Sequence, residues 1–212
     1  MRAAWYEKQG PAKDVLTVGE MPDPHPAAGE VRIRIAASGI NPGDIKKRQD
    51  AFGYGMAYAR VIPHSDGAGQ VDEIGSGVPP EWLGQSVWCY GAQSYRPFGT
   101  AAEFTVVPLD QVARLPTGVS MEQGACLGIP GITAHRAVHV AGVVRGRTVL
   151  IQGAAGAVGL RRSISSSCGS TRDREADMFI YDRTEAPCVV IFDPKGRKFV
   201  LAPEQISAIE AR

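Results

Sequence analysis

The chain has 212 residues, of which 44% are hydrophobic and 21% charged, a composition typical of a globular protein of one large or two small domains. Its 23 basic and 22 acidic side chains leave a net charge of +1, which gives no electrostatic basis for a nucleic acid or an anionic membrane as partner. No apolar run approaches the ~20 residues that span a bilayer, and the N-terminal stretch lacks the apolar core of a secretory signal. We therefore expect a cytoplasmic protein with neither a membrane nor a nucleic acid as partner.

The first 120 residues carry short β-like segments that Gly, Pro and Asp separate. Residues 30–38 alternate apolar and basic side chains with the period of two that is typical of a half-buried strand. Residues 67–78, 85–91 and 101–108 indicate further strands, each ending near a Gly or Pro. Many short strands with such turns predict an antiparallel, barrel-like or sandwich domain over residues 1–120.

The pattern changes near residue 120, where we place a domain boundary. Ser120 stands at an N-cap position before a first helical run, and a second run from Ile132 to Val140 follows a Pro-Gly break. Residues 147–153 predict a short apolar strand. This order of helices and strand is typical of the start of an α/β domain.

A glycine turn follows that strand, with Gly153, Gly156 and Gly159 three residues apart. Where a strand turns into a helix, small residues let the backbone approach a pyrophosphate, and the free N–H groups of the helix start hold its charge. Alone, this spacing is a weak signal, because any tightly packed strand–turn–helix junction also produces it.

Five segments stand in a characteristic order: "SGINPGD" (38–44), "IPHSDGAGQV" (62–71), "FGTAAEFTVVP" (98–108), "GIPGITAHRAV" (128–138) and "VLIQGAAGAVG" (149–159). Up to Leu160 the chain thereby resembles the zinc-independent quinone oxidoreductases, the ζ-crystallin-like branch of the medium-chain dehydrogenase/reductase superfamily. The resemblance implies a GroES-like catalytic domain and a Rossmann domain, with NADPH between them. It also implies hydride transfer to a small-molecule quinone or α,β-unsaturated carbonyl, and it leaves a homodimer open.

The resemblance assigns site residues by position. Asn41 and Thr133 match the residues on either side of the nicotinamide and are the candidates for catalysis and cofactor binding. The pyrophosphate turn corresponds to Gly153, Gly156, Ala157, Val158 and Gly159. Asp44 and Asp66 also lie in family motifs, and we assign them structural roles. Without the resemblance, Asn41 before Pro42 is equally consistent with an ordinary turn residue.

We expect no metal site. The loops that hold zinc in zinc-dependent relatives contain Asn41, His64, Ser65 and Asp66 here, and the chain's four cysteines are too far apart in sequence for a zinc clip. His64, Ser65 and Asp66 are adjacent, so they cannot form the face-to-face geometry of a catalytic triad. Hydride transfer needs mainly two aligned, water-free partners, so the absence of a nucleophile is compatible with this chemistry.

Three further features stay open at this level. His135 and His139 are four residues apart on a helical run and could bind a metal, but they lack an acidic third ligand, which favours a packing role. Tyr54 and Tyr58 either line the substrate entrance or pack in a loop. Many relatives carry a tyrosine at the position of Lys46, so this chain has no aromatic side chain there to play the same role.

The family pattern ends after Leu160. A serine-rich, charged segment follows and is expected to be a flexible linker over residues 161–185. A Rossmann domain takes roughly 150 residues from its first strand, so we expect an incomplete Rossmann unit over 121–160. Residues 186–212 predict a hairpin, with strands at 189–192 and 199–201 around the turn "DPKG", and a short helix.

The fold class expected from these features is β-rich α+β, with a GroES-like N-terminal domain followed by that incomplete unit. Two functions remain open. One is an enzyme of the NADPH:quinone oxidoreductase type. The other is a truncated or rearranged, non-enzymatic remnant with a folded GroES-like domain.

Overall fold

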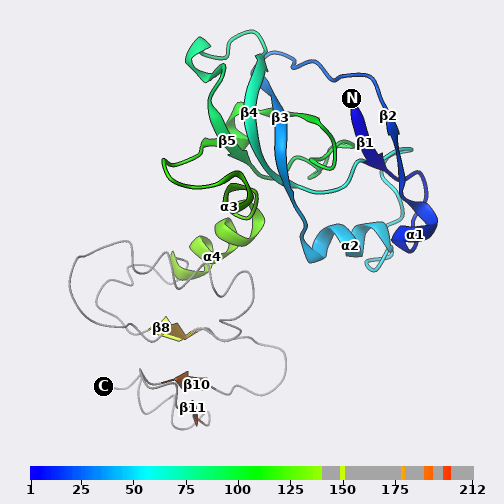
Figure 1. Ribbon diagram of the computed structural model, residues 1–212. Coiled ribbons are helices and arrows are strands. Elements are labelled where there is room, and N and C mark those ends of the chain that lie inside the picture. Colours follow the sequence, from blue (N-terminus) through cyan, green and yellow to red (C-terminus); the bar gives the residue numbers. More distant parts are fainter. Residues whose placement is uncertain (140–148, 151–177, 180–188, 193–197, 202–212) are drawn as a thin grey trace. The chain divides into compact units, whose positions relative to one another are not determined.

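The computed structural model describes residues 1–139, 149–150, 178–179, 189–192 and 198–201 (Figure 1). The chain divides into two compact units, Met1–Ile129 and Pro130–Arg212. Within the described residues, no helix is both long and apolar enough to cross a membrane. The division into four segments that the sequence suggested stays a prediction.

A five-stranded antiparallel sheet forms the centre of the first unit, in the order β6-β3-β4-β5-β7. Figure 1 labels its neighbouring strands β3, β4 and β5. The four strands predicted between residues 30 and 108 are confirmed as antiparallel neighbours, and a fifth short strand was not predicted. Their bounds are β3 Glu30–Gly39, β4 Asp66–Ile74, β5 Ser86–Cys89, β6 Phe104–Pro108 and β7 Val112–Arg114.

The alternating pattern of β3 gives the sheet its buried face. Val31 and Ile33 are fully buried and join a core cluster with valines of the neighbouring strands, among them Val71, Val87 and Val107. Each such valine or isoleucine contributes about 1.5–3 kcal/mol when it leaves water. The period of two in the sequence therefore correctly predicts which face of β3 is buried in the core.

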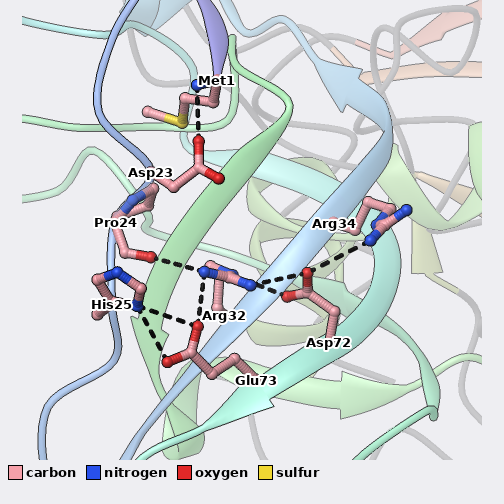
Figure 2. Close-up of polar contacts among 8 residues, drawn as sticks. All are labelled: Met1, Asp23, Pro24, His25, Arg32, Arg34, Asp72 and Glu73. Carbon is pink, nitrogen blue, oxygen red and sulfur yellow. Dashed lines mark hydrogen bonds and ion pairs between the residues drawn. The ribbon is translucent and has the colours of Figure 1, made fainter.

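Arg32, on the opposite face of β3, is the centre of a polar cluster (Figure 2). Its Nε and Nη2 donate to the two carboxylate oxygens of Asp72 at 3.0 and 3.1 Å, and its Nη1 lies 2.6 Å from Glu73 Oε2. The Arg32 guanidinium also stacks on the Phe104 ring, 4.8 Å from its centroid. Since the Arg32 side chain is only 14% exposed, this pairing joins β3, β4 and β6 under limited solvent screening.

The smaller elements of the first unit complete its frame. Strands β1 (Arg2–Trp5) and β2 (Thr17–Glu20) pair antiparallel, and neither was predicted. Ser120 caps helix α3 as predicted, with its Oγ accepting from the Gln123 N–H at 3.2 Å. The helices are α1 Ala12–Val15, α2 Pro42–Arg48 and α3 Met121–Ala125, with short 3₁₀ turns η1 Pro80–Trp82 and η2 Leu109–Gln111.

Helix α4 (Ile129–His139) begins earlier than the sequence predicted. The expected start was Ile132, after a break at Pro130 and Gly131. Proline has no main-chain N–H, but the N–H groups of the first helical turn have no partner within the helix. Its fixed φ is also compatible with a helix, so Pro130 fits in the first turn without cost. The proline therefore marks the first turn of this helix, and the expected break is wrong.

The described part of the second unit contains two strand pairs. Strand β8 (Val149–Leu150) pairs parallel with β9 (Met178–Phe179), and β10 (Val189–Phe192) pairs antiparallel with β11 (Lys198–Leu201). The predicted hairpin strands are confirmed, while their "DPKG" turn lies outside the described residues. Strand β9 falls in the segment expected to be a linker, because an apolar Met-Phe-Ile run follows its charged part. The predicted tail helix also lies outside the described residues.

Candidate active site

The candidate site lies where β3 ends, α2 begins and β4 begins. Asn41 stands at the N-cap position of α2, and Asp66 is the first residue of β4. Asn41 Nδ2 donates to Asp66 Oδ2 at 2.8 Å, and the two residues are 6% and 1% exposed. The β3–β4 register pairs Gly39 with Asp66, which explains how positions 25 residues apart come into contact.

The Asp66 carboxylate has a second donor. The main-chain N–H of Ile129, the first residue of α4, donates to the same Oδ2 at 2.8 Å. The other oxygen, Oδ1, is buried and has no hydrogen-bond partner among the described residues. It lies against Gly128, where a Cβ would overlap the carboxylate. The chain entering α4 thus packs directly on Asp66.

A second buried carboxylate, Asp44, holds Asn41 from the other side. Asp44 Oδ2 accepts from the main-chain N–H of Asn41 at 2.8 Å, and burial raises the pKa of Asp44 despite this bond. Burial also raises the pKa of Asp66 to about 6, although the hydrogen bonds from Asn41 and Ile129 oppose it. Asn41 is therefore fixed twice, by its main chain on Asp44 and by its side chain on Asp66.

His64 joins a chain of hydroxyl groups beside these carboxylates. His64 Nδ1 lies 2.9 Å from Ser38 Oγ, which in turn lies 2.8 Å from Thr100 Oγ1. Thr100 Oγ1 donates to the main-chain oxygen of Asp66 at 2.6 Å. Burial lowers the pKa of His64, which favours the neutral ring. His64 also has a φ of 74°, a left-handed conformation that is costly for a residue with a side chain.

The structure locates only part of the predicted site. Asn41 is buried at the site described above, and Thr133 is exposed on α4, in the second unit. The predicted pyrophosphate turn lies outside the described residues: Gly153, Gly156, Ala157, Val158 and Gly159. These assignments stay predictions. The sequence did not indicate the contact of Asn41 with Asp66 or the hydroxyl chain, because both depend on strand register.

The remaining candidates are placed as follows. Tyr58 packs against the hydrophobic cluster of Tyr6, while Tyr54 is exposed and stacks on Phe52 with ring centroids 5.9 Å apart. Lys46 Nζ lies 5.9 Å from the centroid of the Phe52 ring. Across the residues that the structure describes, no group of three or more His, Cys, Asp or Glu side chains is arranged to hold a metal ion.

Comparisons with known proteins agree with this fold. Residues 27–117 match the family of the alcohol dehydrogenase GroES-like domain. The quinone oxidoreductase of Mus musculus is 38% identical over 138 residues, which cover 65% of this chain and 40% of that protein. The chain thus spans about 40% of the length of this relative.

Two solved structures are similar. An alcohol dehydrogenase superfamily protein from Novosphingobium aromaticivorans has a TM-score of 0.72 and 32% identity, covering 80% of this chain and 51% of that one. A mycobacterial protein complexed with NADPH has a TM-score of 0.66 and 29% identity, covering 77% of this chain and 48% of that one. With a β-rich GroES-like domain at residues 27–117, the chain is a homologue of the quinone oxidoreductases in the medium-chain dehydrogenase/reductase superfamily.

Proposed function

We propose that the chain carries the catalytic domain of an NADPH-dependent quinone oxidoreductase, which transfers a hydride to a small quinone or α,β-unsaturated carbonyl without a metal. The observation that carries this proposal is Asn41, buried and held by two carboxylates at the position that the resemblance assigns beside the nicotinamide. Such a fixed amide suits a reaction whose rate depends on aligning two planar partners. The homology to quinone oxidoreductases and the NADPH complex of a relative support it further.

The residues that the structure describes are compatible with the cofactor. Asn41 has a hydrogen-bonding side chain in a fixed orientation, and Thr133 is an exposed residue. The glycines at 153, 156 and 159 would hold the pyrophosphate through main-chain N–H groups. NADPH, when bound, supplies the hydride. The residues of the chain would orient the nicotinamide ring and exclude water.

A fluorescence titration of the full chain with NADPH tests the proposal. Saturable binding in the micromolar range is expected, together with loss of NADPH absorbance when a small quinone is added. Asn41→Ala is expected to weaken turnover by about tenfold or more, because it removes an aligning contact. Thr105→Val is the matched control: Thr105 is equally buried in the first unit, but its hydroxyl has no partner among the described residues.

A second function, a folded GroES-like domain that binds no cofactor, is favoured by one observation. The first unit has its own hydrophobic core and contains the entire family match. A flat NADPH titration from a chain with a folded far-UV spectrum supports this second function and contradicts the first.

A further inference from the structure

We propose that Asp66 is the positioning residue of the site: its carboxylate fixes which end of the Asn41 amide, the NH₂ group or the carbonyl oxygen, is presented to a ligand. This inference builds on the proposed function, and it concerns a residue that sequence motifs assigned only to the frame of the domain. Two donors share one carboxylate oxygen of Asp66, Asn41 Nδ2 and the Ile129 N–H, both at 2.8 Å.

A carboxylate oxygen with two N–H donors can only accept, so the NH₂ group of Asn41 has to face Asp66. The amide cannot rotate by half a turn, because its own oxygen would then face Asp66 Oδ2. The carbonyl oxygen of Asn41 is thereby left as the acceptor for a ligand group such as an amide N–H. Asp44 cannot perform this task, since it binds the main chain of Asn41 and not the side chain.

The position of Asp66 is in turn fixed by main-chain atoms. Ile129 donates from the first residue of α4, and Gly128 lies so close that no larger residue fits beside Oδ1. The carboxylate therefore has one orientation, and the side chain of Asn41 takes its orientation from the backbone at the start of that helix.

The same orientation holds whether or not Asp66 is ionised. Oδ2 uses its lone pairs for two N–H donors, so a proton on the carboxyl group resides on the unpartnered Oδ1. The titratable groups that influence this carboxylate or respond to it are Asp44 and the Cys89 thiol, and His64 interacts with Asp44. None of them donates to Oδ2.

The first test is independent of any ligand. In the ¹⁵N-labelled full chain, hydrogen exchange of the Asn41 side-chain NH₂ group is measured by NMR. We expect exchange slowed about tenfold or more in the unmodified chain, from a hydrogen bond to a charged group. Asp66→Ala should abolish this protection, Asp66→Asn should restore part of it through its own carbonyl, and Thr105→Val, at a buried residue whose hydroxyl has no partner among the described residues, should leave it unchanged.

The second test concerns the ligand. Asp66→Ala should weaken NADPH binding or raise KM by about tenfold or more, as expected for a lost aligning contact, with partial rescue in Asp66→Asn and no change in Thr105→Val, the matched buried control. Equal losses in Asp66→Ala and Thr105→Val would overturn the proposal by showing a general packing effect. If Asp66→Ala does not fold, free-rate exchange of Asn41 in the unmodified chain still overturns it. Protected exchange in a chain that binds no NADPH supports the positioning and contradicts only the proposed function.

Discussion

Asp66 makes the stability of the first unit depend on pH in a predictable way. Its folded-state pKa is raised from 3.8 to about 6, because burial disfavours the charged form. The protonated Asp66 carboxyl therefore contributes fully to the free energy of unfolding below pH 3.8, and this contribution is lost as the pH rises through about 6. At about 1.36 kcal/mol per pKa unit, the loss amounts to ~3 kcal/mol at neutral pH. Asp66→Asn removes this contribution, since the amide does not titrate.

The assay is urea unfolding followed by tryptophan fluorescence, because all three tryptophans lie in the first unit. Between pH 4 and 7.5, the unfolding free energy of the unmodified chain should fall relative to Asp66→Asn by about 2–3 kcal/mol. Asp44, whose raised pKa also lowers the stability as the pH rises, and His64, whose lowered pKa acts in the opposite direction, are present in both chains, so their own contributions cancel in the difference. The influence of the Asp44 charge on the pKa of Asp66 remains part of the measured effect. Parallel curves for the two chains across this range would refute the reasoning.

Three further substitutions test the packing by urea unfolding. Arg32→Lys should lower the free energy of unfolding by about 1–2 kcal/mol, because a single ammonium group cannot make the bidentate interaction with the largely buried Asp72 carboxylate. An unchanged urea midpoint would contradict this. Gly128→Ala should cost about 2 kcal/mol or more, since its Cβ meets Asp66. Gly131→Ala, three residues further on in the first turn of α4, faces open space and should cost nothing. Tyr95→Gly should stabilise by about 0.5–1 kcal/mol, because Tyr95 is 98% exposed and has a φ of 59°; a loss of stability would show that its ring is needed.

The strands of the central sheet were predictable because burial on one face forces a period of two in the sequence. Residues 30–38 show this most clearly, and their inward positions are those of the core. Strands β1 and β2 are not predicted from the sequence, because four-residue segments such as "RAAW" are too short to show an alternation of apolar and polar side chains. Helix α2 was missed because "NPGD" is also a common turn sequence, and only the packed structure continues it into a helix.

The site was less predictable than the fold, for a physical reason. Asn41 was found through its motif, yet the chemistry around it depends on the pairing of Gly39 with Asp66, and a single sequence does not specify such a register. The donor from Ile129 is still more remote, 63 residues from Asp66 along the chain. The sequence pattern indicates only a structural role for Asp66, because its two partners are visible only in three dimensions.

Stability and positioning respond in opposite directions to one substitution, and this separates the two roles of Asp66. Asp66→Asn removes a buried charge, so at neutral pH the variant should unfold less readily. The same change replaces charge-assisted hydrogen bonds to Asn41 and Ile129 with weaker neutral ones. Exchange of the Asn41 amide should therefore be faster in the more stable protein. A residue that served the frame alone would change both quantities in the same direction, because a firmer fold would protect every group inside it.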